Sequence, residues 1–91
     1  MENTEKKVVM ISGANRGIGK VVAEKLSEDG YLLSLGIRNP GNLPGSLSSI
    51  PENQLLCHAY DAKIPQNAKS WIDGTIEYFG RIDVLINNAG I

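Results

Sequence analysis

The chain has 91 residues, which is enough for one small domain or for part of a larger one. Its composition, 42% hydrophobic and 21% charged, is typical of a globular protein and excludes a disordered one. A net charge of −1, with scattered Lys and Arg residues, argues against a nucleic-acid partner. The single cysteine excludes an internal disulfide framework and a Cys-based zinc site, so we expect no metal centre. The polar start MENTEKK and the shortness of the apolar runs predict a soluble, cytoplasmic protein with no membrane partner.

The beginning of the chain predicts a strand, a helix and a second strand. Residues 7–12 (KVVMIS) are apolar and β-branched, which favours a strand buried on both faces. From Ile18 onward the apolar residues recur at helical spacing, and Gly30 stands where a left-handed C-terminal cap belongs. The apolar run YLLSLGI at residues 31–37 predicts the second strand.

The rest of the chain continues the alternation after an irregular segment. Residues 39–53 are rich in Pro, Gly and Ser and predict a loop with a single helical turn near Leu47. A strand, a helix closed by Gly80 and a further strand then follow, at residues 54–60, 66–79 and 82–87. The resulting order, β-α-β-loop-β-α-β, is typical of an α/β protein with a parallel sheet and right-handed crossovers.

Three glycines, Gly13, Gly17 and Gly19, lie between the first strand and the first helix, in the stretch SGANRGIGK. A helix N-terminus presents unpaired N–H groups and a partial positive charge, and glycine allows a phosphate to approach them closely. The stretch therefore predicts a phosphate-binding turn, with an ordinary tight turn as the alternative. A P-loop is excluded because its glycine spacing differs and because Val21 stands where that motif needs a hydroxyl.

The GxxxGxG spacing resembles the glycine motif of the short-chain dehydrogenase/reductase family. Two further stretches match that family in the expected order: YDA at residues 60–62, ending the third strand, and NNAG at residues 87–90, ending the fourth. The resemblance covers essentially the whole chain apart from residues 39–53, where family members more often carry a helix. It implies that residues 1–91 are the N-terminal part of one Rossmann-type dinucleotide-binding domain, a doubly wound parallel sheet truncated after the fourth strand.

The resemblance also implies roles for individual residues. Gly13 would permit the turn, the backbone from Asn15 to Ile18 would face the cofactor pyrophosphate, and Gly17 and Gly19 would let the helix start close to the phosphates. Ser12 replaces the usual Thr and keeps the hydroxyl. Asn87 would tie adjacent strands together. The complete set of expected cofactor-binding residues is Gly13, Asn15, Arg16, Gly17, Ile18, Gly19, Arg38, Asp61, Ala62, Asn88, Ala89 and Gly90.

Residues from two later segments are expected to form the adenosine side of the site. Asp61 would accept a hydrogen bond from the adenine amino group, with the backbone of Ala62 as a neighbouring contact. The alternative for Asp61 is a helix N-cap before Pro65, and both roles can coexist. The segment from Asn88 to Gly90 would pass beneath the adenosine ribose.

The choice of cofactor can be argued from charge at the end of the second strand. An NAD-binding fold places a carboxylate there for the ribose 2′-hydroxyl, whereas this sequence has Ile37 followed by Arg38. A guanidinium can bind a 2′-phosphate through charge-assisted hydrogen bonds worth about 1.5–3 kcal/mol. Arg16 offers a second cation. We therefore expect NADP(H) rather than NAD(H), with a solvated surface charge as the alternative for each arginine.

Catalysis in this family depends on a serine and a Tyr-x-x-x-Lys pair after NNAG, and no Tyr-x-x-x-Lys occurs in these 91 residues. We therefore expect the NADP(H)-binding portion of an oxidoreductase acting on a carbonyl or alcohol substrate, itself inactive and with no catalytic residue. A non-catalytic NADP(H)-sensing module and an inactive fragment are the alternatives. The fourth strand would be an unpaired apolar edge, open to self-association.

Three conspicuous side chains are interpreted as packing residues rather than as parts of a site. His58 lies in the third strand with no second ligand or acidic partner nearby in the sequence. Cys57 is expected to be a small buried hydrophobe, and Trp71 belongs to the apolar stripe of the helix at residues 66–79.

Overall fold

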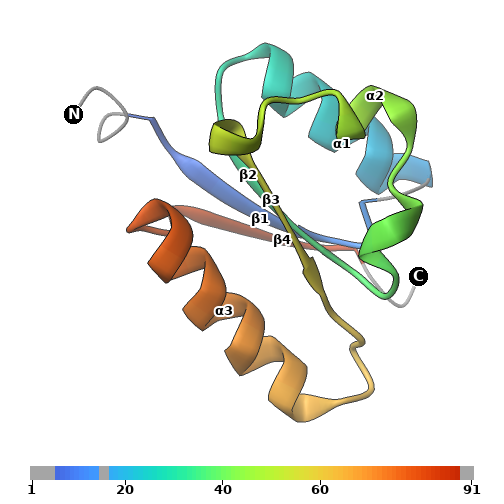
Figure 1. The fold of residues 1–91 in the computed structure, drawn as a ribbon, viewed down its shortest axis with the longest axis vertical. Coiled ribbons are helices and arrows are strands. Elements are labelled where there is room, and N and C mark those ends of the chain that lie inside the picture. Colours follow the sequence, from blue (N-terminus) through green and yellow to red (C-terminus); the bar gives the residue numbers. More distant parts are fainter. Residues whose placement is uncertain (1–5, 15–16, 89–91) are drawn as a thin grey trace.

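The computed structural model describes residues 6–14 and 17–88. They form a four-stranded parallel sheet with the strand order β3-β2-β1-β4 (Figure 1). The strands are β1 (Val8–Ser12), β2 (Leu32–Ile37), β3 (Leu55–Ala59) and β4 (Val84–Asn87). This arrangement confirms the prediction of an α/β fold with a parallel sheet.

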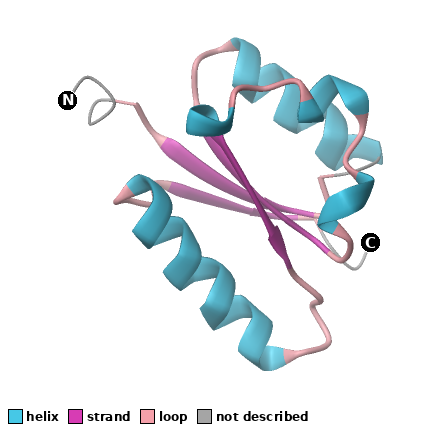
Figure 2. Ribbon diagram, in the orientation of Figure 1, coloured by secondary structure: helices cyan, strands magenta, loops and turns pink. Residues whose placement is uncertain are grey.

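Helices cover both faces of the sheet, as Figure 2 shows. Helix α1 (Gly17–Glu28) and the short helix α2 (Gly45–Ser48) lie on one face, and α3 (Pro65–Phe79) lies on the other. The predicted helix ends are confirmed at Gly30 and Gly80, which have φ values of 93° and 85°. The two-sided covering matches the doubly wound architecture.

The burial of each strand follows its position in the sheet. Every residue of β1 and β2, the two central strands, is buried. This confirms the prediction that the first strand is buried on both faces. Of the outer strands, β3 is mostly half-buried and β4 is mostly exposed. Within the described residues β4 pairs with β1 alone, and its Val84 and Leu85 are 43% and 58% exposed.

The face under α1 and α2 carries the apolar core. Its buried members come from β1, the turn after it, β2, α1 and α2: Val9, Ile11, Ala14, Leu33, Leu35, Ala23 and Leu47. Leu47 confirms the helical turn predicted in the irregular segment. Two 3-10 turns, Pro40–Asn42 and Glu52–Gln54, were not predicted there. The second turn begins after Pro51 and is held to α3 by a hydrogen bond from the Tyr78 hydroxyl to the Glu52 carbonyl.

The face under α3 contains a closed polar network. The Trp71 indole N–H donates to Ser34 Oγ at 2.8 Å, and the Thr75 hydroxyl donates to the Trp71 carbonyl at 2.8 Å. Because that bond uses the only Thr75 hydroxyl hydrogen, the 2.7 Å contact between Ser34 and Thr75 has Ser34 as its donor. A Cβ at Gly36 would stand 2.8 Å from the indole ring. Trp71 is therefore a core residue, as predicted, and its position depends on a glycine and a serine of β2.

Within the described part of the chain, no helix is long and apolar enough to cross a membrane.

Candidate cofactor-binding site

The predicted site residues meet at one edge of the sheet because the strands are parallel. Ser12, Ile37, Ala59 and Asn87 end β1, β2, β3 and β4, so the segments that follow them emerge side by side (Figure 1). The direction in which the strands are added reverses at β1, which has β2 on one side and β4 on the other. In doubly wound sheets the ligand crevice lies at this switch point, outside the carboxyl ends of the strands.

The turn after β1 uses glycine for its backbone conformation. Gly13 and Gly17 have φ values of 69° and 63°, which side-chain-bearing residues rarely adopt. The Gly13 amide donates to the Gly36 carbonyl at 2.9 Å and is therefore committed to the sheet. This supports Gly13 as the residue that permits the turn. The predicted Asn15 and Arg16 lie outside the described residues.

Gly19 allows α1 to begin against the ends of β1 and β4. A Cβ at this position would stand 2.5 Å from Asn88 Nδ2 and 2.7 Å from the Gly13 carbonyl oxygen. Asn88 Nδ2 itself donates to that carbonyl at 3.2 Å. By contrast, a Cβ at Gly17 would meet nothing within 4 Å, and the neighbouring Ile18 is 76% exposed. Among the described residues, the helix start is thus packed on its sheet side and open on the other, which fits an approaching phosphate.

Ser12 joins β1 to β4 through its hydroxyl. Its Oγ donates to Asn87 Oδ1 at 3.0 Å and accepts from the Asn88 amide at 2.8 Å. The prediction that Asn87 ties adjacent strands is confirmed, and the hydroxyl kept at Ser12 has a role in that tie. The predicted Ala89 and Gly90 lie outside the described residues.

The turn after β3 is closed by hydrogen bonds around Asp61. The Asp61 amide donates to Asn67 Oδ1 at 2.9 Å, the Lys63 amide donates to Asp61 Oδ1 at 3.0 Å, and the Ile64 amide donates to the Asp61 carbonyl at 2.9 Å. Two groups are left without a partner in the described part of the chain, the Ala62 N–H and Asp61 Oδ2. The turn therefore leaves one donor and one acceptor unbonded among the described residues.

The N-cap interpretation of Asp61 is wrong. The cap residue of α3 is Ile64, whose side chain makes no capping hydrogen bond. Among the described residues the Asp61 carboxylate bonds the Lys63 amide, in the turn before the helix, and no amide of the first turn of α3. Sequence reasoning also missed Asn67, whose partner is a backbone amide; a polar residue in a first helical turn gives no signal of such a bond.

Arg38 follows β2 directly and is exposed. It forms no ion pair with any described residue, so its guanidinium is not already engaged by a carboxylate there. The next residue, Asn39, accepts a hydrogen bond from the Gly41 amide through its side chain at 3.3 Å and opens the first 3-10 turn. The chain thus bends away after Arg38, at the edge where the site residues gather.

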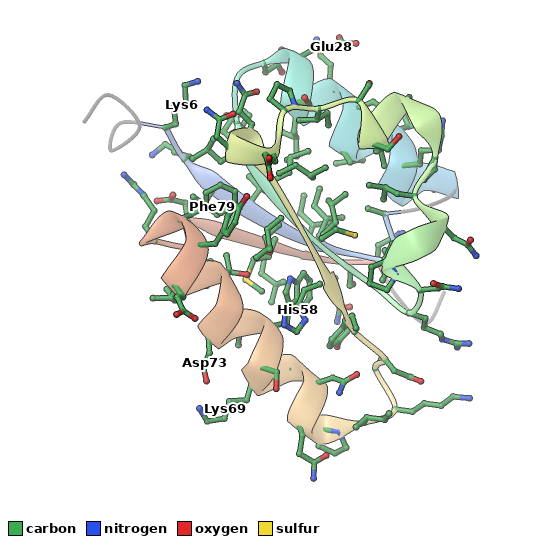
Figure 3. The ribbon with its side chains drawn as sticks, in the orientation of Figure 1. Lys6, Glu28, His58, Lys69, Asp73 and Phe79 are labelled. Atoms are coloured by element: carbon green, nitrogen blue, oxygen red, sulfur yellow. The ribbon has the colours of Figure 1, made fainter. Side chains whose placement is uncertain are left out.

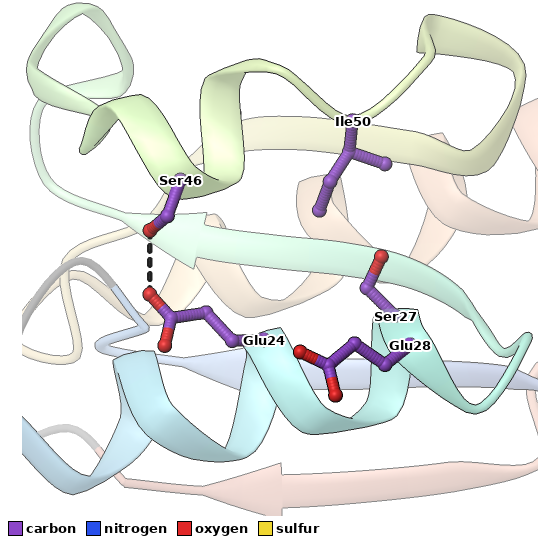
Figure 4. A pocket seen from close by; sticks show the side chains of 5 residues that line it. All are labelled: Glu24, Ser27, Glu28, Ser46 and Ile50. Atoms are coloured by element: carbon purple, nitrogen blue, oxygen red, sulfur yellow. Dashed lines mark hydrogen bonds between the residues drawn. The ribbon is translucent and has the colours of Figure 1, made fainter.

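A hollow of about 300 Å³ lies elsewhere, between α1 and the segment around α2 (Figure 4). Glu24 and Glu28 line it together with Ser27, Ser46 and Ile50. Hydrogen bonds from Lys20 and then Ser46 hold the pKa of Glu24 below its ordinary value, so this carboxylate is ionised near neutral pH. Two carboxylates repel a phosphate, which makes this hollow unsuited to a dinucleotide.

The residues interpreted as packing residues behave as such. His58 lies between β3 and α3 (Figure 3), where a Cβ at Gly74 would stand 3.1 Å from its ring. Cys57 was predicted to be buried and is only half-buried; it packs against the apolar core, and desolvation raises the pKa of its thiol. No group of three or more His, Cys, Asp or Glu among residues 6–14 and 17–88 could hold a metal ion.

Comparison with known proteins agrees with this geometry. Residues 7–91 match the family described as short chain dehydrogenase. The Agropine synthesis reductase of Rhizobium rhizogenes is 43% identical over 84 residues, which is 91% of this chain and 19% of that protein. The chain therefore spans about a fifth of the length of this relative.

Solved structures of similar fold are consistent with this match. The structure described as ElxO with NADP bound is 34% identical, with a TM-score of 0.82 over 94% of this chain and 36% of the other. A 3-ketoacyl-(acyl-carrier-protein) reductase from Brucella melitensis complexed with NADH has a TM-score of 0.78 over 87% of this chain and 32% of the other. At 23% identity the latter shows the fold alone. The chain belongs to the short-chain dehydrogenase family.

Proposed function

We propose that this chain is the NADP(H)-binding portion of an oxidoreductase that acts on a small carbonyl or alcohol substrate. The proposal rests on the geometry at the start of α1. Gly19 packs it against Asn88 and the Gly13 carbonyl at the switch point of the sheet, while the space beside Gly17 stays open. An anion at this place is favoured by the helix dipole and by the N–H groups of the first turn.

The expected site residues divide among the parts of a dinucleotide. The first turn of α1, with the backbone from Asn15 to Ile18, would bind the pyrophosphate. Asp61 Oδ2 would accept from the adenine amino group and the Ala62 N–H would donate to ring nitrogen N1, because the two unbonded groups match that edge of the base. The segment from Asn88 to Gly90 would pass beneath the adenosine ribose.

The cofactor, when bound, supplies or receives the hydride. The residues of this chain bind and orient it, and no Tyr-x-x-x-Lys pair that could exchange a proton with a carbonyl substrate occurs in the 91 residues. We therefore expect the 91-residue chain to bind cofactor without turnover. The activity of a complete protein would need these groups from further sequence.

The preference for NADP(H) over NAD(H) rests on Arg38. This guanidinium lies just after β2, forms no ion pair with a described residue, and is accompanied by no carboxylate at the strand end. A carboxylate there would repel the 2′-phosphate of NADP(H), whereas a guanidinium can bind it bidentately. The NADP bound to the ElxO structure supports this assignment.

Calorimetric titration of the 91-residue chain with NADPH and with NADH tests the proposal. We expect NADPH to bind about tenfold to a hundredfold more tightly, as a charge-assisted hydrogen-bond pair allows. Arg38→Glu is expected to remove that preference, because the carboxylate repels the 2′-phosphate and can accept from the 2′-hydroxyl of NADH, whose binding should not weaken. Lys6→Glu is the matched control, because Lys6 precedes β1 and so lies at the amino ends of the strands, opposite the expected site. Equal affinities of the wild-type chain would contradict the cofactor preference, and the absence of any binding would contradict the site.

We also propose that the 91-residue chain self-associates through β4. Its outer edge carries no partner strand among the described residues, and Leu85 is 58% exposed. Such an edge is a template for pairing with a second copy. Sedimentation velocity of the wild-type chain should show a concentration-dependent dimer, which Leu85→Lys abolishes and Ile72→Lys, on exposed α3 surface, does not. A wild-type monomer at all concentrations would contradict this.

A further inference from the structure

Helix α3 begins without a conventional N-cap. The capping position is occupied by Ile64, whose side chain cannot accept a hydrogen bond, and the first helical residue is Pro65. Asn67, the third helical residue, uses its side chain in another way: Oδ1 accepts from the Asp61 amide at 2.9 Å. In a capping box the side chain of the third helical residue bonds the amide of the cap residue. Here the Asn67 side chain bonds the amide of Asp61, three residues before the cap.

This bond fixes the turn that carries the unbonded donor and acceptor. The Asp61 amide is bound to Asn67, the Asp61 carbonyl to the Ile64 amide, and Asp61 Oδ1 to the Lys63 amide. Because hydrogen bonds hold the Asp61 backbone and Asp61 Oδ1, the direction of Asp61 Oδ2 is set as well. Asn67 is half-buried and sits on a regular helix, so it holds Asp61 from a rigid element.

The residue before Asp61 is anchored independently. The Tyr60 amide donates to the Ile37 carbonyl at 2.8 Å, and the Tyr60 ring packs on Trp71 with ring centroids 4.8 Å apart. Loss of the Asn67 bond should therefore leave β3 and Tyr60 in place. Only the segment from Asp61 to Lys63 would lose its tie to α3, and its two internal hydrogen bonds would remain.

We propose that Asn67 is a positioning residue that aims Asp61 Oδ2 and the Ala62 N–H at the adenine edge and so sets selectivity for adenine over a 6-oxopurine. This inference rests on the proposed function. Adenine offers an amino group that donates and an N1 that accepts. Hypoxanthine offers a carbonyl oxygen that accepts and an N1–H that donates, so both contacts would have the wrong polarity. The discrimination depends on holding both protein groups at fixed positions.

The test compares the dissociation constants of NADPH and of its hypoxanthine analogue for the 91-residue chain by calorimetry. The wild-type chain is expected to prefer NADPH about tenfold to a hundredfold. Asp61→Ala should remove most of this ratio. Asn67→Ala should lower it about threefold to tenfold, as expected for one lost neutral hydrogen bond that restrains the turn. Asn67→Asp retains an oxygen acceptor at the same place and should keep the wild-type ratio of the two dissociation constants.

Gln66→Ala is the matched control, because Gln66 is an exposed neighbour in the same helical turn. Circular dichroism and the fluorescence of Trp71, the only tryptophan, check that each variant is folded. If Asn67→Ala unfolds, Asn67→Leu removes the same acceptor with a similar volume and should show the reduced ratio.

The outcomes separate the two proposals. No NADPH binding by the wild-type chain overturns the proposed function and this inference with it. NADPH binding with a ratio that Asp61→Ala lowers but the Asn67 variants leave unchanged overturns the inference alone. An Asn67→Ala variant that loses affinity for both dinucleotides equally, with no change in ratio, shows a merely structural role and also overturns it. A ratio that Asp61→Ala leaves unchanged overturns the adenine contact and the inference together.

Discussion

Helices α1 and α3 both follow a strand at the carboxyl edge of the sheet, but their first turns differ. At α1, Gly19 brings the helix against Asn88, and the space beside Gly17 is open. At α3, Pro65 has no N–H to offer, and the Asn67 side chain is turned back to the Asp61 amide. The first arrangement leaves backbone groups accessible to an anion, and the second holds a carboxylate in place. Under the proposed function, two helix starts at the same edge would therefore serve the pyrophosphate and the adenine of one dinucleotide.

Gly19→Val attacks the start of α1 and is expected to have the largest effect. The new side chain would overlap Asn88 Nδ2 and the Gly13 carbonyl, which a Cβ alone would approach to 2.5 and 2.7 Å. We expect a loss of about 3 kcal/mol in the free energy of unfolding in urea, together with loss of NADPH binding. Gly45→Val is the control, because a Cβ there meets nothing within 4 Å. Equal stability of both variants would show that α1 does not depend on the close approach.

Ser34→Ala weakens the attachment of α3 without touching its first turn. It leaves the buried Trp71 indole N–H without an acceptor and removes the donor to Thr75. We expect the free energy of unfolding to fall by about 2 kcal/mol. The selectivity for adenine should persist in the folded variant, because Asn67 and Asp61 are unchanged. Ser48→Ala, at an exposed position, is expected to alter stability by less than about 0.5 kcal/mol. A Ser34→Ala chain as stable as Ser48→Ala would contradict the role of the network.

The smallest expected effect concerns Asp83, which lies in neither helix. The Arg81 side chain, followed by the Val8 amide, holds the pKa of this carboxyl below its ordinary value of 3.8. A group with a lowered folded pKa stabilises the fold above its unfolded pKa, and that contribution is lost as pH falls through the folded value. Urea unfolding should therefore show a weaker acid destabilisation below about pH 4 for Asp83→Asn than for the wild type. Arg81→Gln should change the profile in the same direction by less. Superimposable acid profiles of all three chains would contradict this linkage.

The elements of this fold could be predicted because each strand is a short apolar run and each long helix ends at a glycine. The strands β1 and β4 lie within the predicted ranges, and the order of elements agrees. Within residues 39–53 the helical turn at Leu47 was predicted, but the 3-10 turns Pro40–Asn42 and Glu52–Gln54 were not. The second of these turns is held by the Tyr78 hydroxyl, which comes from a helix later in the sequence. Local composition does not reveal that contact.

The candidate site likewise contains features that the sequence predicts and features that it does not. Positions marked by glycine were predictable, since close approach and positive φ leave few other residues possible. The bonds of Asn67 and Ser34 were not, because their partners are a backbone amide in another segment and an indole contributed by another element. Neither the type of these residues nor their spacing indicates such partners.

The most direct test of the central claim is a two-dimensional ¹H–¹⁵N spectrum of the 91-residue chain titrated with NADPH. If the dinucleotide lies across the starts of α1 and α3, the amide signals of Gly17, Gly19 and Ala62 should shift in proportion to occupancy. The signals of Ser46 and Ile50, which line the acidic hollow, should stay in place. Shifts confined to that hollow, or no shift at the helix starts under saturating NADPH, would contradict the account.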